Sequence, residues 1–160
     1  MAKETKTNAM RILEQQKIPY TFHSYECDHF VDGITVAQRM GQPPEKTFKT
    51  LVTQGKSRGY FVFVLPVAEE LDLKKAARQV NEKSLEMVHL KDILQVTGYI
   101  RGGCTPVGMK KLFPTCFHES CLNFETIFVS GGRPGTQIEV APQDLIAVSR
   151  GITADIICDA

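Results

Sequence analysis

The sequence predicts a single α/β domain built on a mixed, curved β-sheet. Its 160 residues are enough for one compact domain with a buried core. Helical and strand-like segments alternate irregularly along the chain, which favours a mixed sheet over a regular doubly wound fold. Short turn signals are spread evenly, and neither a repeat nor a low-complexity linker divides the chain, so residues 1–160 are expected to form one domain.

The first part of the chain predicts a helix, a strand and a second, short helix. Thr7 can cap a helix whose apolar residues recur at helical spacing, and Pro19 lies just beyond its expected end. Residues 20–25 alternate aromatic and polar side chains, which is typical of a half-buried strand. A short helix through residues 36–40 is expected to stop at Gly41.

A β-hairpin followed by a helix is expected next. Residues 48–53 and 60–65 are rich in β-branched and aromatic side chains, and they flank a glycine-containing turn. The second of these strands is apolar on both faces, so other layers of the fold should cover it on both sides. Asp72 then opens a helix that is expected to continue to Val80.

The rest of the chain predicts two more helices and three more strands. The expected segments are a helix over 90–96, strands over 99–101, 126–130 and 136–140, and a helix over 142–148 with proline in its first turn. Together with the earlier elements, they give the irregular order from which the mixed sheet is predicted.

Composition excludes several classes of protein. Lys and Arg number 19 and Asp and Glu 18, so the net charge of +1 gives no strong field for gripping a polyanion along a long footprint. No stretch approaches the roughly 18 consecutive apolar residues of a membrane helix, and the first residues lack the apolar core of a signal peptide. We therefore expect a cytoplasmic protein with no membrane partner and only local contact with nucleic acid.

The cysteines and histidines do not predict a metal site. Five cysteines at irregular spacing are expected to be reduced thiols. Cys116, His118 and Cys121 could supply zinc ligands, but no second ligand pair lies nearby at a finger-like spacing, and the alternative is two buried cysteines beside a surface histidine. We expect neither a metal nor a cofactor. The histidines are interpreted as ordinary surface or hydrogen-bonded side chains: His23, His29, His89 and His118.

Three features could carry chemistry, although the G-x-S-x-G, H-E-x-x-H and P-loop motifs are absent. Residues 98–108 hold several glycines and a proline, so their amides could bind a phosphate or polarise an ester carbonyl, or the segment is a plain tight turn. Residues 130–135 offer amides beside a guanidinium, or form an ordinary hairpin turn. Lys49 interrupts an apolar strand, and it is interpreted either as a site residue or as a solvated residue at a strand edge.

The order of four segments gives these features a context. Residues 48–51, 71–75, 98–108 and 129–132 follow one another as they do in the YbaK/EbsC family, which the chain resembles over nearly its whole length. More narrowly, it is similar to the Cys-tRNA(Pro)/Cys-tRNA(Cys) deacylases, which are related to the editing domain inserted in bacterial prolyl-tRNA synthetases. No single motif is very specific, but the ordered set is.

The resemblance implies a barrel-like mixed sheet surrounded by helices, with a cleft that receives the 3′ end of an aminoacyl-tRNA. The expected activity is removal of cysteine from tRNA(Pro) and tRNA(Cys), with prolyl-tRNA synthetase as a further partner. In this family the substrate's own thiol attacks its ester carbonyl, so the enzyme is a deacylase that acts formally as a lyase if a thiolactone is released. Solvated charged faces are expected for the other basic residues, including Lys74 and Lys75.

The resemblance also implies site residues. Lys49 matches the lysine on which activity in the family depends and is expected to anchor the terminal phosphate or ribose, and Gly102 and Gly103 belong to the loop that carries the ester carbonyl. The remaining matched positions are expected to bind substrate: Tyr20, Thr50, Tyr99, Cys104, Thr105, Pro106, Ser130, Gly131 and Gly132. Cys104 stands where relatives carry an aliphatic residue, either as a nucleophile or as a small buried thiol.

Two other functions remain open from the sequence. One is deacylation of a different ester, such as Ala-tRNA(Pro), although an alanyl ester has no thiol for self-attack. The other is a non-catalytic module that binds tRNA ends or a nucleotide. Retention of Lys49 and of the whole glycine loop favours the enzyme over the binding module.

Overall fold

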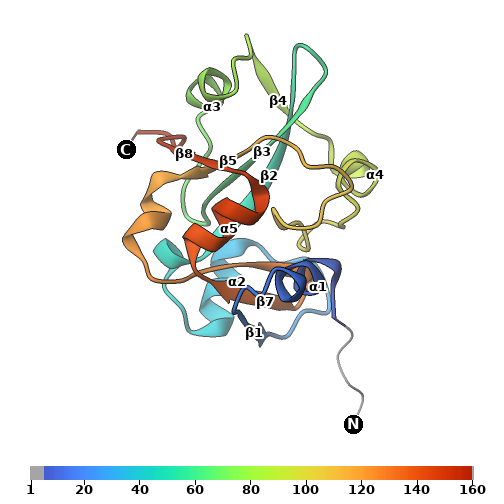
Figure 1. Cartoon of the computed structure of the whole chain (residues 1–160), viewed down its shortest axis with the longest axis vertical. Coiled ribbons are helices and arrows are strands. Elements are labelled where there is room, and N and C mark those ends of the chain that lie inside the picture. The colour runs from blue at the N-terminus through green and yellow to red at the C-terminus, as the bar shows by residue number, and fades with distance from the viewer. Residues whose placement is uncertain (1–5, 160) are drawn as a thin grey trace.

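Eight strands and five α-helices make up residues 6–159, the part of the chain that the computed structural model describes (Figure 1). In chain order they are α1 (Asn8–Gln15), β1 (Thr21–Ser24), α2 (Gly33–Met40), β2 (Phe48–Gly55), β3 (Tyr60–Pro66), α3 (Leu73–Gln79), β4 (Leu85–Met87), α4 (Ile93–Thr97), β5 (Thr115–His118), β6 (Ile127–Arg133), β7 (Thr136–Val140), α5 (Pro142–Ser149) and β8 (Ile152–Ala154). Short 3-10 helices cover η1 (Pro44–Lys46), η2 (Leu90–Asp92) and η3 (Glu119–Asn123).

The helices begin and end at the residues that the sequence marks. The Thr7 hydroxyl accepts a hydrogen bond from the Met10 amide at the start of α1. Gly41 ends α2 in the left-handed conformation, with φ of 68°. Asp72 caps α3 by accepting from two amides of its first turn. All five helices predicted from the sequence are confirmed, the fourth as η2 followed by α4.

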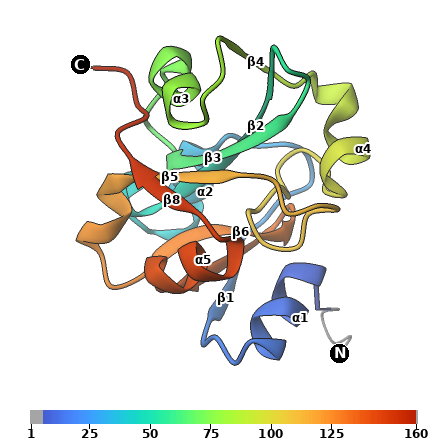
Figure 2. The same ribbon diagram turned by 45° about the horizontal axis from the view of Figure 1, so that its top comes forward.

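The strands form two sheets instead of one. A three-stranded antiparallel sheet has the order β1-β7-β6, and a five-stranded mixed sheet has the order β4-β2-β3-β5-β8. In the larger sheet the β2–β3 and β2–β4 pairs are antiparallel, whereas the β3–β5 and β5–β8 pairs are parallel. Figure 2 shows β3, β5 and β8 side by side.

The mixed α/β class is confirmed, but the expectation of a barrel-like sheet is wrong. Among the described residues, one isolated bridge, Thr47 to Phe128, pairs the two sheets. The parallel strand β5 occupies the side of β3 that a closing strand would need, and β8 extends the sheet beyond it. The two sheets therefore pack against each other with their edges open.

One predicted strand is wrong and three short strands were not predicted. Residues 99–101 form a turn, because Gly98 ends α4 with φ of 87° and the Tyr99 amide donates to the Thr97 hydroxyl instead of to a neighbouring strand. The unpredicted strands β4, β5 and β8 have three or four residues each, which is too short for an alternating pattern to be visible in the sequence.

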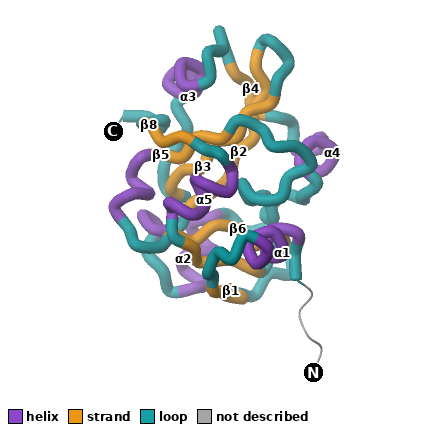
Figure 3. The backbone as a smooth tube through the Cα atoms, in the orientation of Figure 1, coloured by secondary structure: helices purple, strands orange, loops and turns teal. Residues whose placement is uncertain are grey.

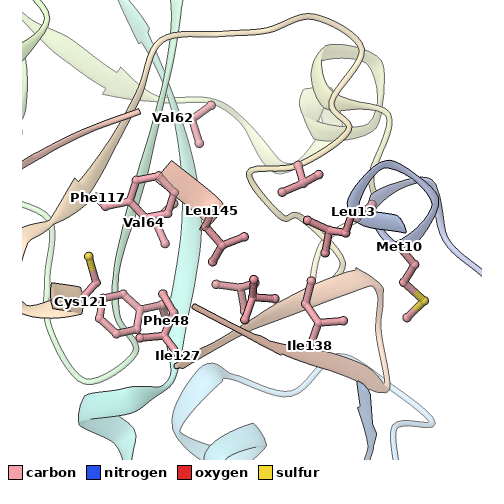
Figure 4. Packing of buried hydrophobic residues seen from close by; sticks show 14 residues of the cluster. Met10, Leu13, Phe48, Val62, Val64, Phe117, Cys121, Ile127, Ile138 and Leu145 are labelled. Atoms are coloured by element: carbon pink, nitrogen blue, oxygen red, sulfur yellow. The ribbon is translucent and has the colours of Figure 1, made fainter. Parts of the chain in front are cut away.

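Strand β3 is buried on both faces, as its sequence predicts. Val62 and Val64 face a core cluster that lies between α1, α5 and the small sheet and includes Leu13 and Leu145 (Figure 4). The alternate residues of the strand, Phe63 among them, face a second cluster under α3. Within residues 6–159, every helix is too short to span a membrane.

Candidate functional site

A cleft of about 420 Å³ lies where the two sheets meet. Its walls come from the start of β2, the N-terminal part of α2, the facing strands β6 and β7, and the loop that follows α4. That loop, drawn in teal between α4 and α1 in Figure 3, runs from residue 98 to residue 114. The cleft brings together these residues predicted as site residues: Lys49, Thr50, Gly102, Cys104 and Ser130.

Lys49 projects from β2 into an environment with few partners. Its side chain is half-buried, and its one hydrogen bond to residues 6–159 is a long contact of 3.5 Å from Nζ to the Val67 carbonyl. Burial lowers the pKa of the Lys49 ammonium, while Glu70 and Glu69 raise it in part. A half-buried ammonium without a close carboxylate partner can bind an anion that enters the cleft.

Two buried polar atoms in the cleft wall have no hydrogen-bond partner within residues 6–159. They are the hydroxyl oxygen of Thr50 and the side-chain carbonyl oxygen of Gln137. Gln137 is only 6% exposed. Buried polar atoms are almost always paired, so an unpaired acceptor in a cleft indicates a place where a ligand can donate.

The glycine loop uses some of its amides internally and leaves others open. The Gly103 amide donates to the Ile100 carbonyl over 2.9 Å and is thereby committed to a tight turn. The amides of Gly102 and Cys104 have no such partner among the described residues, and both residues line the cleft. The tight turn, one of the two alternatives that the sequence left open, is therefore present at Gly103, and the amide cradle stays a prediction for the amides of Gly102 and Cys104.

Gly103 packs against backbone, which is why a side chain does not fit there. A Cβ atom at this position would lie 2.9 Å from the Arg133 Cα and 3.2 Å from its amide nitrogen. The loop is thus pressed against the end of β6. The Ser130 hydroxyl strengthens this contact by donating to the Gly102 carbonyl over 3.4 Å.

Gly131 and Gly132 lie in the hairpin between β6 and β7, so the hairpin interpretation of residues 130–135 fits their position. A register shift between Ser130 and Arg133 makes a β-bulge, in which Gly132 has φ of 105°. The Gly131 carbonyl accepts from the Thr7 hydroxyl, so the bulge is tied to the start of α1. Neither glycine lines the cleft.

The other predicted site residues lie outside the cleft. The Tyr99 hydroxyl donates to the Val107 carbonyl over 2.6 Å and closes the glycine loop from behind, and burial raises its pKa to about 12. Thr105 is fully buried, and Pro106 lines a separate apolar pocket of about 170 Å³. Tyr20 lies near the surface, where its hydroxyl donates to Glu14.

Sequence reasoning missed three residues of the cleft. The Arg101 guanidinium stacks on the Phe30 ring, 3.7 Å from the ring centroid, at the wall made by Gly102. Phe30 lies in an irregular segment where no periodicity marks it, and Arg101 was placed in a strand that does not exist. Gln137 sits in a correctly predicted strand, where a polar residue between apolar ones is typical of a solvated face, yet it is buried.

Cys104 lines the cleft, whereas Cys116 and Cys121, the two possible zinc ligands, do not. Burial raises the pKa of the Cys104 thiol, although its contact with the Thr97 hydroxyl acts in the other direction. Cys116 and Cys121 are buried in the core, and the adjacent His118 is also buried, where its Nδ1 accepts from the Ile156 amide. Within residues 6–159, no group of three or more His, Cys, Asp or Glu side chains is arranged to hold a metal ion.

Comparison with known proteins gives a consistent family. The model of the aminoacyl-tRNA editing domain matches residues 32–148, which include Lys49, the glycine loop and the β6–β7 hairpin. EbsC of Enterococcus faecalis, a proposed Cys-tRNA(Pro)/Cys-tRNA(Cys) deacylase, is 46% identical over 155 residues, which cover 96% of this chain and 94% of that protein.

A partial sequence match and a solved structure of similar fold add to this comparison. A proline–tRNA ligase of Fervidobacterium nodosum is 37% identical over 75 residues, which cover 47% of this chain and 13% of the ligase. The crystal structure of a proposed trans-editing enzyme for prolyl-tRNA synthetase has the same fold, with a TM-score of 0.82 at 24% identity over 98% of this chain and 100% of that chain.

Proposed function

Because the chain belongs to the family of aminoacyl-tRNA editing domains, we propose that it removes wrongly attached cysteine from tRNA. It cleaves the ester that joins the amino acid to the 3′-terminal ribose. The observation that carries this proposal is the cleft, which combines a poorly paired ammonium on Lys49 with the open amides of Gly102 and Cys104.

The cleft offers the two kinds of group that such an ester requires. Open amides can donate to the carbonyl oxygen as negative charge develops on it in the transition state, and glycine lets the substrate come close to the backbone. Lys49 can hold the phosphate or ribose of the terminal nucleotide as a point charge. We assign the ester carbonyl to the amides of Gly102 and Cys104, while Gly103 shapes the turn that exposes them.

The reaction that fits this cleft uses the substrate's own thiol. The thiol loses its proton, its sulfur attacks the ester carbonyl carbon, and the bond from that carbon to the ribose oxygen breaks. The ribose oxygen leaves with the electron pair and takes up a proton, so the products are tRNA and a cyclic thioester of cysteine, which water later opens. Holding sulfur and carbonyl in attack geometry contributes several kcal/mol without a catalytic side chain.

The protein's own thiol in the cleft is a poorer nucleophile. A raised pKa keeps the Cys104 side chain protonated at neutral pH, whereas the thiolate is the reactive form. We therefore assign Cys104 a packing role for its side chain and a binding role for its amide.

Editing of this kind is needed because a synthetase cannot select its amino acid by size and shape alone. A pocket for proline cannot strongly reject an amino acid of similar size, because such differences are worth only about 1–3 kcal/mol. We propose tRNA(Pro) as the main substrate and tRNA(Cys) as a second one. With a net charge of +1 the protein has little general attraction for the tRNA body, so prolyl-tRNA synthetase is the proposed partner that selects it.

The test is deacylation of Cys-tRNA(Pro), Ala-tRNA(Pro) and Pro-tRNA(Pro) by wild type and by Lys49→Ala. The expected result is rapid loss of cysteine that depends on Lys49, with the alanyl and prolyl esters spared. Preference for the alanyl ester would replace the thiol mechanism by ordinary hydrolysis. Absence of turnover on every ester would leave a module that binds tRNA ends.

A further inference from the structure

The unpaired acceptors of Gln137 and Thr50 are not explained by the steps above. Both atoms are buried, both residues line the cleft, and neither atom has a partner among the described residues. Leaving such a group unpaired costs about 1–3 kcal/mol. Because the fold keeps two of them in the same cleft, a donor on the substrate is the simplest source of the missing bonds.

The position of Gln137 relates these acceptors to the ester. Gln137 on β7 is the direct cross-strand partner of Ser130 on β6, and side chains of such partners share one face of the sheet. The Ser130 hydroxyl in turn bonds the carbonyl of Gly102, whose amide is assigned to the ester oxygen. The unpaired Gln137 oxygen therefore lies close to the part of the cleft that holds the ester carbonyl.

An aminoacyl ester carries its strongest donor at this place. The α-ammonium group is attached to the carbon next to the ester carbonyl and has three N–H donors, whereas a thiol is only a weak donor. The lining carboxylate of Asp32 is partly occupied, because one of its oxygens caps α2 by accepting from the Thr35 amide. Neutral acceptors such as an amide carbonyl and a hydroxyl remain available for the ammonium.

We propose that Gln137 and Thr50 bind the α-ammonium group, so that the cleft selects esters of free amino acids, an inference that rests on the proposed function. Hydrogen bonds to a charged group are stronger than neutral ones. The pair acts on substrate selection and holds the carbonyl against the amides of Gly102 and Cys104. Esters that lack a free α-amino group should be poor substrates.

The test uses tRNA acylated chemically with cysteine or with 3-mercaptopropionate, which keeps the thiol and the ester but lacks the amino group. Each enzymatic rate is divided by the rate of spontaneous hydrolysis of the same ester, because the ammonium group itself activates the ester. Wild type is expected to prefer the cysteinyl ester by about 10- to 100-fold, the range for a hydrogen bond to a charged group.

Variants identify the residues responsible. Gln137→Leu should slow the cysteinyl ester and leave the mercaptopropionyl ester unchanged, which a general loss of structure would not do. Gln137→Glu keeps an acceptor and should retain the preference. If Gln137→Leu does not fold, Thr50→Val decides, with Thr53→Val as its matched control on the same strand, because the Thr53 hydroxyl donates to the Phe61 carbonyl outside the cleft.

The outcomes separate this inference from the proposed function. Equal normalised rates on both esters by wild type would overturn ammonium recognition while leaving the deacylase intact. Slowing of both esters to the same degree by Thr50→Val and Gln137→Leu would also overturn it, because the residues would then act on the shape of the cleft. Failure of wild type to cleave the cysteinyl ester would instead refute the proposed function.

Discussion

Lys49 and Lys75 are two partly buried lysines whose surroundings are opposite. Lys75 on α3 donates to Asp155 over 3.0 Å, to Asp159 over 2.8 Å and to the Ile157 carbonyl over 2.8 Å. These bonds raise the pKa of its ammonium. Lys49 has a single long contact, and burial lowers the pKa of its ammonium.

The difference shows how one residue type serves two purposes in this fold. A lysine whose donors are all occupied fixes chain segments to one another, and Lys75 ties α3 to the C-terminal residues. A lysine whose donors are left open lowers the stability of the fold but remains able to bind a ligand. The cleft as a whole resembles Lys49 in this respect, because it also contains the unpaired acceptors of Thr50 and Gln137 and the open loop amides.

The largest effect is expected from Lys49→Met. Loss of a charged contact to the substrate should lower the rate of Cys-tRNA(Pro) deacylation about 100-fold. The same variant should be at least as stable as wild type at neutral pH, because a lowered pKa means that the protonated form is less favoured in the folded state than in the unfolded state. This advantage should shrink as the pH approaches about 10, where the unfolded-state lysine also loses its proton.

Deacylation assays and thermal melts at pH 7 and pH 10 test both parts for Lys49→Met. A variant that keeps wild-type activity would remove Lys49 from the binding machinery. A variant that melts well below wild type at neutral pH would show that Lys49 stabilises the fold, as Lys75 does.

Gly103→Ala extends the comparison from side chains to backbone. The new Cβ atom would meet the Arg133 backbone at 2.9 Å, so the loop must shift and its open amides with it. We expect a loss of deacylation of about 10- to 100-fold, since small displacements of positioned groups have effects of that size. The matched control is Gly59→Ala at the tip of the β2–β3 hairpin, where the nearest atom lies at 3.4 Å and activity should not change.

Measuring both alanine variants against Cys-tRNA(Pro) separates loop geometry from a general effect of glycine replacement. Similar activity of the two variants would contradict the role of the 98–108 loop in holding the ester.

Lys75→Met should lower the melting temperature by a few degrees and leave the deacylation rate of the folded protein unchanged.

The effect of Lys75→Met should depend on pH. Asp155 has a lowered pKa because Lys75 bonds it, so the contribution of Asp155 to stability is complete above the unfolded-state pKa of about 3.9 and is lost as the pH falls through the folded-state value. The Lys75 contribution is complete below about pH 10.4 and is lost as the pH rises through its raised pKa. The difference in melting temperature between wild type and variant should therefore be constant near neutral pH and shrink at both extremes. A difference that does not depend on pH would mean that packing of the lysine stem, and not its charge, holds the C-terminal residues.

Sequence patterns could predict the long elements and the caps, because these depend on neighbours within a few residues. The helix starts at Thr7 and Asp72 and the two-sided burial of β3 are examples. The open sheet and the short strands β5 and β8 could not be predicted, since they depend on pairing between segments far apart in the chain.

The same limit explains which residues of the cleft could be predicted. The resemblance located Lys49 and the glycine loop, but nothing local distinguishes Lys75 from the exposed Lys74 beside it, because the Lys75 partners lie 80 and 84 residues away. The pairing state of Gln137 likewise appears only when β7 is set against β6 and the cleft is closed by the loop.

The smallest effect is expected in the stability of the two threonine variants of β2. Thr53→Val removes a hydroxyl that donates to the Phe61 carbonyl over 3.0 Å and should lower the free energy of unfolding by about 1 kcal/mol. Thr50→Val removes a buried hydroxyl that has no partner in the described chain, so the valine should leave the free energy of unfolding unchanged or raise it slightly. Urea unfolding of both variants measures the difference, with the m-value as a check that the unfolding transition is comparable. If Thr50→Val is destabilised as much as Thr53→Val, the Thr50 hydroxyl is already satisfied in the free protein, and the cleft loses one of the acceptors assigned to the substrate.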